Sequence, residues 1–273
     1  MRGGWPTWVL LLWALVALTA SWLPLHPEQM ALEAILQGPT AGNWLGSDDL
    51  GRPVFDRLLS GASTSFQVAA LVVSLSLLFG TLVGAVAAYV GGFWERVLVM
   101  IIDIFMAFPG ILLAIALAGV LGPGIDNLVL ALTLVGWVGF ARLARAQVLS
   151  VKRHEHVVAA QALGTRAPRI ILHHLLPLIV APLVVEATFG VAAVVIAESG
   201  LSFLGLGVQP PDASWGSMIR DGVRYLLVAP HLVLAPGCAL FLVVLSVNLL
   251  GDRLRDWLDV RNVRRPLVQG AGT

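Results

Sequence analysis

Three carboxylates lie within or beside strongly apolar stretches of the chain: Asp103, Glu186 and Glu198. An ionised carboxylate in hydrocarbon is costly, so each is a candidate for the lining of a path through the membrane. Asp103 and Glu198 lie near the ends of their stretches, and we interpret both as structurally paired. Glu186 lies deeper. We leave two alternatives for its side chain: a cavity-facing contact with the transported solute, or a hydrogen bond at a helix interface.

The remaining chemically active side chains form no pattern typical of an enzyme or a metal site. His154 and His156 are too close in sequence to share a helical face. The single cysteine, Cys238, excludes an internal disulfide and a site with several cysteine ligands. The sequence lacks a Ser/His/Asp or HExxH arrangement on its apolar stretches, and it lacks a phosphate-binding G-x-x-x-x-G-K-[ST] loop. We therefore expect no catalytic residue, no metal site and no cofactor in this chain.

Composition places most of the chain in lipid. Hydrophobic residues make up 58% of the sequence and charged residues 12%, and the mean hydropathy is +0.88. A soluble core of this length cannot bury so much apolar surface. Because 17 basic residues nearly balance 16 acidic ones, the chain has no net field that would attract nucleic acid.

Hydropathy predicts an all-α membrane protein with six transmembrane helices. A helix needs about 20 apolar residues to cross the hydrocarbon. The six stretches that qualify are Trp8–Leu23, Phe66–Val90, Val97–Leu121, Leu128–Val148, Leu178–Ile196 and Leu232–Leu250. The first has an alternative reading as a cleaved signal peptide, because Arg2 precedes it and Ala20 is small. We divide the chain into an N-terminal span with an outer amphipathic segment (1–64), a core permease (65–253) and a C-terminal tail (254–273).

Basic residues near the ends of the stretches set the orientation, because they favour the cytoplasm. With the N-terminus inside, the cytoplasmic segments hold Arg2, Arg96, Arg142, Arg145, Lys152, Arg153, Arg166, Arg169, Arg253, Arg255, Arg261, Arg264 and Arg265. The outer segments hold only Arg52, Arg57, Arg220 and Arg224. Both termini are therefore predicted to be cytoplasmic, which fits an even number of spans.

Two outer segments have the composition of short helices. After Pro53, apolar residues at helical spacing predict an interfacial helix before the second span. After Pro210-Pro211, Asp212 or Ser214 is suited to cap another short helix at the outer mouth of the path. Within the second span, Gly80 and Gly84 indicate close helix packing, with a glycine-lined pore as the alternative.

The longest polar interruption, Val151–Pro177, predicts a cytoplasmic pair of helices between spans four and five. We expect Val157, Val158, Ala160 and Leu163 to share one side of the first helix, and Gly164-Thr165 to end it. Pro168 opens a second helix, and Pro177 ends the segment as span five begins. Such a pair suits a groove on another protein. An amphipathic hairpin resting on lipid head groups is the alternative.

This segment resembles the EAA loop of binding-protein-dependent ABC importers, whose pattern has Glu-Ala-Ala, a glycine and a closing proline. The matching positions are Ala159, Ala160, Gly164 and Pro177. Val158 replaces the glutamate of the pattern, and Glu155 is the candidate to substitute for it. The resemblance implies that the segment couples to an ATPase. The candidate coupling residues are Glu155, Ala159, Ala160, Gly164, Thr165, Arg166 and Pro177.

Other segments resemble the dipeptide, oligopeptide and nickel permeases within those importers. WLGSDDLGRPVFDRLLSGASTSF is similar to an outer segment written around GTD-x-x-GRD, from which Ser47 and Pro53 depart. Later matches, in the same order as in the family, are VMIIDIFMAFPGILLAI, AESGLSFLGLGVQPPDASWGSMI and NLLGDRLRDWLDVR. The resemblance runs from Trp44 to Arg261.

The resemblance implies a heteromeric importer in a bacterial inner membrane. Its other parts would be a homologous second permease, one or two subunits that bind ATP and magnesium, and an extracytoplasmic solute-binding protein. It leaves the cargo open between peptides and nickel, and we favour peptides. The alternatives are an ion- or proton-coupled carrier that uses Asp103, Glu186 and Glu198, and a docking platform without transport.

Overall fold

The computed structural model describes residues 4–263, with side chains described for 4–20 and 22–258. This part of the chain is all α, without named strands. Four helical runs in it are long and apolar enough to cross a membrane: α2 (Val54–Val90), α5 (Ile125–Val151), Ala167–Phe203 and α10 (His231–Val263). A bent pair, α3 (Gly92–Met106) and α4 (Gly110–Leu121), raises the candidates to five if it counts as one span.

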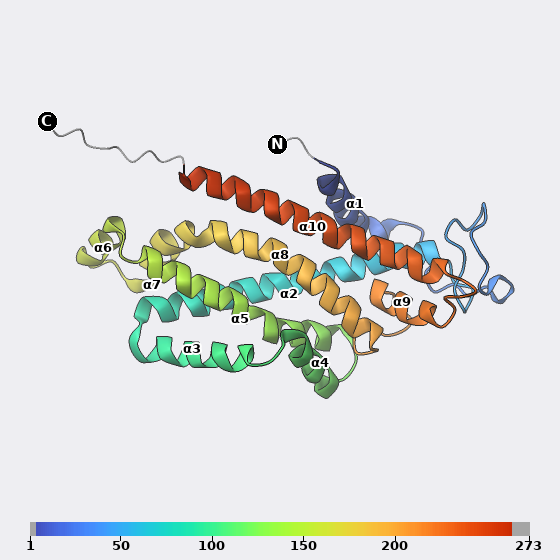
Figure 1. Ribbon diagram of the computed structural model, residues 1–273, viewed down its shortest axis with the longest axis horizontal. Helices are drawn as coiled ribbons and strands as arrows, with labels where there is room; N and C mark the ends of the chain where they lie inside the picture. The colour runs from blue at the N-terminus through green and yellow to red at the C-terminus, as the bar shows by residue number, and fades with distance from the viewer. Residues whose placement is uncertain (1–3, 264–273) are drawn as a thin grey trace.

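The long helices lie side by side along the molecule (Figure 1). Helix α6 (Glu155–Ala162) lies at one end and α9 (Trp215–Val223) at the other, and we call these the α6 end and the α9 end. Helices α2 and α5 are in close contact, because Gly80 and Gly84 leave no room between their backbones. A Cβ atom at either glycine would collide with the carbonyl oxygen of Trp137 or Ala141 on α5. Close packing, and not a glycine-lined pore, is therefore confirmed for this face.

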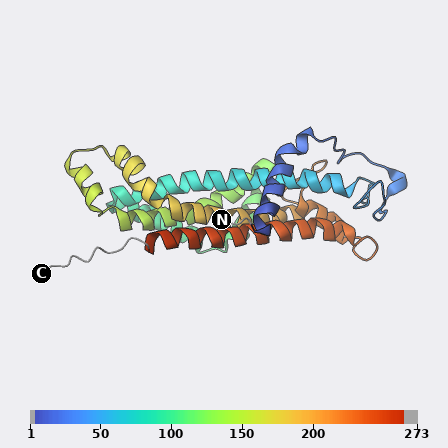
Figure 2. The same ribbon diagram turned by 90° about the horizontal axis from the view of Figure 1, so that it is seen from above.

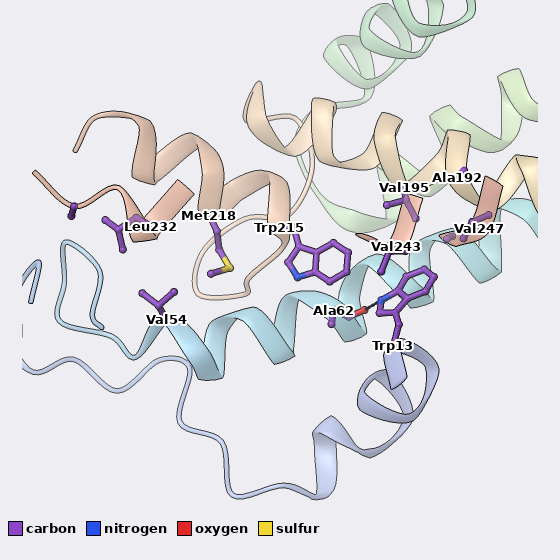
Figure 3. Close-up of a cluster of buried hydrophobic side chains, with 12 residues drawn as sticks. Trp13, Val54, Ala62, Ala192, Val195, Trp215, Met218, Leu232, Val243 and Val247 are labelled. Atoms are coloured by element: carbon purple, nitrogen blue, oxygen red, sulfur yellow. Dashed lines mark hydrogen bonds between the residues drawn. The ribbon is translucent and has the colours of Figure 1, made fainter. Parts of the chain in front are cut away.

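Helix α1 (Trp5–Thr19) is shorter than the span expected at Trp8–Leu23. It has 15 residues and continues as a 3-10 turn at Ala20–Trp22, so this segment lies at the short end of the range of about 17–25 residues that cross the hydrocarbon. The Trp13 indole nitrogen donates to the Ala62 carbonyl of α2 at 3.1 Å. Trp13 also lies beside Trp215 of α9, with 6.2 Å between ring centroids (Figure 3). The N-terminal helix is thus fixed to α2 and α9 by buried aromatic side chains.

The stretch predicted as one span at Val97–Leu121 is broken. Helices α3 and α4 meet at 87° around Ala107, Phe108 and Pro109. Proline lacks a backbone N–H and disfavours a helical conformation at the residue before it, so α3 ends just ahead of Pro109. Hydropathy alone does not register this break, because the residues on both sides are apolar.

The interfacial helix that we predicted after Pro53 does not form as a separate element, so this prediction is wrong. Helix α2 begins at Val54, directly after Pro53, and runs unbroken for 37 residues. Gly61 lowers helix propensity by only about 1 kcal/mol, and the segment between Pro53 and Val90 has no proline to end the helix. The amphipathic residues after Pro53 are therefore the first turns of α2.

The second outer helix forms as predicted. Ser214 caps α9: its hydroxyl accepts from the Ser217 backbone N–H at 3.2 Å, and the Ser217 hydroxyl lies 3.0 Å from the Ser214 backbone nitrogen. At the other end of the chain, α10 continues through residues 254–263, which we expected to begin a separate tail. Residues 264–273 of that tail, and Arg2, lie outside the described residues.

Candidate functional site

Helix α6 and the corner that follows it project from the α6 end of the bundle (Figures 1 and 2). The chain then enters α7 (Ala167–Ile170), with Pro168 in its first turn as predicted. This arrangement confirms that 151–177 contains a short helix and a corner between two long membrane helices.

Gly164 makes the corner by its backbone conformation. Its φ is +75°, in the left-handed region that glycine enters without a steric penalty. The Thr165 N–H donates to Ala160 at 3.1 Å and the Gly164 N–H to Gln161 at 2.9 Å, which together form a Schellman motif that closes α6. No atom lies within 4 Å of the position that a Cβ at Gly164 would occupy. The backbone, and not crowding within this chain, therefore requires glycine here.

The two faces of α6 differ from the prediction. Val157 and Ala160 are buried against the bundle, with 0% and 8% exposure, but Val158 is 48% and Leu163 86% exposed. The four residues therefore do not share one side as predicted, because α6 meets the bundle through a narrow edge only. Glu155, Ala159 and Arg166 are also exposed, whereas Thr165 is half-buried. The outward face of α6 thus combines apolar and charged side chains.

Pro177 does not end a separate second helix, which corrects our prediction. Helix α7 passes through a π-helical turn at Ile171–Leu175 into α8 (Leu176–Phe203). The Leu176 N–H bonds to the Ile171 carbonyl, five residues back. Pro177 has no backbone N–H to donate, and the π turn before it lets the helix continue past this residue. The corner at Gly164 is therefore joined to a single helical run from Ala167 to Phe203.

Two polar contacts hold the neighbouring ends of the bundle together, and the sequence analysis missed both. Arg145 of α5 and Glu95 of α3 form an ion pair at 2.7 Å. The Lys152 ammonium donates to the Ala88 carbonyl of α2 at 3.0 Å. Each contact joins residues that are far apart in sequence, so no local pattern signals it. Together they fix the end of α5 from which α6 departs.

Glu198 is fully buried and hydrogen-bonded on both carboxylate oxygens. Ser65 of α2 donates to Oε2 at 3.0 Å, Ser199 donates to the same oxygen at 3.3 Å, and Ser202 donates to Oε1 at 2.8 Å. The bond from Ser65 joins α2 to α8, which is the kind of structural pairing we expected, and the other two lie within α8. Asp103, by contrast, is exposed on α3, and its side chain has no hydrogen bond or ion pair within the described chain. The pairing expected for Asp103 is therefore not found there.

Glu186 faces a cavity of about 560 Å³ between α5, α8 and α10. Gln147 of α5 and Arg255 of α10 are the other polar lining residues. The Glu186 Oε1 atom lies 3.6 Å from the position that a Cβ at Gly139 would occupy. Of the two alternatives left open for Glu186, the cavity-facing one fits the described residues. No hydrogen bond from this carboxylate to another helix is present among them.

Comparison with known proteins identifies the family. The model of the family described as "Binding-protein-dependent transport system inner membrane component" matches residues 80–264. The chain belongs to this family. It is therefore the inner-membrane permease of an ATP-driven ABC importer, and the ion-coupled carrier is set aside.

Curated relatives of this permease share much of its length. The dipeptide transport permease DppC of Alkalihalophilus pseudofirmus is 44% identical over 82% of this chain and 74% of its own. The nickel transport permease NikC of Escherichia coli K12 is 38% identical over 92% and 91%. The glutathione transport permease GsiD of Escherichia coli O6:K15:H31 is 40% identical over 89% and 81%.

A solved structure shares the fold of this permease. A chain of the MetNI methionine ABC transporter, in an inward-facing conformation, aligns with a TM-score of 0.61. The alignment covers 75% of this chain and 97% of that one, at 20% identity. At this identity the likeness concerns the fold alone.

The permease also has a charge network at the α9 end that sequence reasoning missed. Asp48 pairs with Arg52 at 2.6 Å and with Arg57 at 3.5 Å, and all three side chains are buried. Burial, and then the neighbouring Asp48, raise the pKa of Asp49. The network fastens the GSDDLGRP segment to the start of α2, so this part of the family resemblance has a structural role.

The histidines form no metal site in the described part of the permease. His154 precedes α6 instead of belonging to it, which brings its ring to 5.8 Å from that of His156. The argument that these residues cannot share a helical face therefore does not apply, because His154 lies outside the helix. No cluster of three or more His, Cys, Asp or Glu side chains suited to a metal ion occurs among the described residues.

Proposed function

We propose that this permease crosses the membrane six times, with both termini in the cytoplasm and the α6 end facing inward. Helix α2 ends at the α6 end (Figure 1). Helix α5 begins next to the connection between α8 and α9, where the Gly124 N–H donates to the Gly207 carbonyl at 3.1 Å. The bent pair α3–α4 therefore connects the two ends of the bundle, as one broken span would. Gly4 lies beside Arg253, so α1 starts close to the last turns of α10. The concentration of basic residues at the α6 end supports the inward orientation.

The proposed role of α6 is to couple the permease to an ATP-binding subunit. The observation that carries this proposal is that α6 lies outside the bundle, with Val158 and Leu163 exposed. Apolar side chains on a short projecting helix are suited to a groove on another protein. Glu155 and Arg166 would lie at the rim of that contact, and Ala159 would allow close approach.

The complete importer would contain a homologous second permease, one or two ATP-binding subunits and an extracytoplasmic solute-binding protein. ATP and magnesium would be bound by the partner subunits, and closure of the ATPases would move α6 and switch the permease pair from inward-open to outward-open. We propose a peptide as cargo, in line with the DppC and GsiD relatives; NikC, the nickel permease, represents the competing cargo. Asp103, Glu186 and Glu198 stay candidates for the path, and Glu186 is the one that faces a cavity.

The first test is purification of the tagged permease from its native membrane in mild detergent, with mass spectrometry of the bound proteins. Recovery of a second permease and an ATP-binding subunit is expected. Recovery of this chain alone, with transport that does not need ATP, would contradict the proposal.

The second test replaces Gly164 by leucine. The left-handed conformation costs a residue with a side chain about 1–2 kcal/mol, and the side chain would also stand between α6 and its groove. We expect ATP-driven uptake to fall at least about fivefold while the complex still folds. Gly92→Leu is the matched control, because Gly92 has φ +63°, open space around its Cβ position and a place outside α6. Equal uptake in the two variants would contradict the assignment of α6.

A further inference from the structure

The cavity between α5, α8 and α10 has an unusual lining for a membrane helix bundle. Its walls carry a carboxylate, a guanidinium and a primary amide, from Glu186, Arg255 and Gln147. Glu186 lies near the middle of the run Ala167–Phe203, whereas Arg255 lies in the last turns of α10. The cavity therefore extends along the bundle from mid-span toward the α6 end, and the Glu186 and Arg255 side chains are both exposed along it.

Both charged groups are without a partner. Among the described residues, neither the Glu186 carboxylate nor the Arg255 guanidinium forms an ion pair or a hydrogen bond. Ionised side chains within a span are costly, and they persist where they face a cavity or find a counter-charge. Gly139 leaves room beside the Glu186 carboxylate, since Oε1 is 3.6 Å from its Cβ position. The site thus offers two opposite charges along one cavity.

We propose that this cavity binds the two charged ends of a zwitterionic solute of peptide type. The ammonium group would pair with Glu186, the carboxylate with Arg255, and a peptide carbonyl or amide with Gln147. An extended dipeptide spans about 7 Å, and the cavity volume of about 560 Å³ lies within the range of roughly 300–1,000 Å³ that small organic ligands occupy. This inference rests on the proposed function and specifies the class of cargo.

The same lining disfavours a bare divalent cation. Glu186 is the sole acidic group among the described lining residues, which include no histidine or cysteine. Nickel prefers several nitrogen, oxygen or sulfur ligands in a defined geometry, and the guanidinium in the same cavity would repel a cation. The cavity therefore distinguishes a peptide-like solute from free nickel.

The test uses the intact importer complex in nanodiscs, without ATP and without the solute-binding protein. Binding of radiolabelled Ala-Ala is measured in competition with unlabelled Ala-Ala, N-acetyl-Ala-Ala and Ala-Ala-amide. A charge-assisted hydrogen bond is worth about tenfold or more in affinity, so each blocked peptide is expected to compete at least about tenfold more weakly than Ala-Ala. Glu186→Gln should abolish the discrimination against the acetylated peptide only. Arg255→Gln should abolish the discrimination against the amide only.

The controls distinguish a failure of the proposed binding site from a failure of the proposed importer function. Asp126→Asn and Arg253→Gln remove charges outside the cavity and should retain both discriminations, and Arg255→Lys should retain discrimination against the amide. In the same preparation, ATP hydrolysis stimulated by the solute-binding protein tests the importer itself. Unaltered discrimination in the variants, or no saturable binding of Ala-Ala while stimulated hydrolysis persists, would overturn the proposed site. Absence of stimulated hydrolysis in the wild type would instead overturn the proposed function.

Discussion

Removing the Glu198 carboxylate is expected to loosen the contact between α2 and α8. Hydrogen bonds between membrane helices contribute on average about 0.6 kcal/mol and at most about 1.7 kcal/mol. Glu198 accepts one such bond, from Ser65 of α2, whereas Ser199 and Ser202 donate to it from within α8. The bond across the two helices therefore contributes about 0.6–1.7 kcal/mol, and Glu198→Ala adds the cost of a cavity at a fully buried position. Glu198→Gln keeps the size and an acceptor oxygen, so we expect it to lose only about 1 kcal/mol.

The assay is denaturant unfolding of the purified protein in mild detergent, combined with a double-mutant cycle. Ser65→Ala removes the bond between α2 and α8, whereas Thr64→Ala, its control, removes a bond to Ser60 within α2. Glu198→Ala and Ser65→Ala should destabilise less together than the sum of their separate effects. Strict additivity, or a Glu198→Ala variant as stable as the wild type, would refute the view that this carboxylate joins the two helices.

Two further substitutions test the packing of the bundle. Gly84→Ala should destabilise the protein by about 1–3 kcal/mol in detergent unfolding, because the new Cβ would collide with the Ala141 carbonyl. Gly119→Ala is its control: this glycine has open space, so the change should be neutral or stabilising, and equal effects would contradict the close approach. Trp13→Phe removes the hydrogen bond to Ala62 but keeps an aromatic ring, so the same assay should show a loss of about 1 kcal/mol. An unchanged stability would mean that this bond does not hold α1.

The sequence predicted the elements whose signals are local. Long apolar stretches identify α2, α5, α8 and α10, since the length needed to cross hydrocarbon is a property of each segment alone. Ser214 was recognised as a cap because the capping side chain and the N–H groups it satisfies lie within a few residues. Gly164 was recognised as a corner for the same reason. Each of these predictions depends on a few neighbouring residues and on no distant contact.

The predictions that failed concern segments whose structure depends on contacts with residues distant in sequence. The helical run continues through Pro177, which follows a π turn, whereas α3 ends just ahead of Pro109. Which outcome occurs depends on the packing around each proline. Periodicity alone grouped Val158 with Val157 and Ala160 on one side of α6, whereas the narrow edge that α6 buries is set by the position of the bundle. The buried network around Asp48 likewise joins groups that no short pattern brings together.

The run from Ala167 to Phe203 connects the features that matter for transport. At 1.5 Å per residue, its 37 residues extend about 55 Å. It begins beside the Gly164 corner, passes Glu186 at the cavity, and reaches Glu198 at the polar contact with α2. Because the π turn keeps the run continuous, we expect a displacement at α6 to be passed on to α8. The contact at Glu198 holds the far end of that helix against α2, so we expect a tilt at the corner to displace Glu186 more than Glu198. The cavity would then change shape with little disturbance of the α9 end.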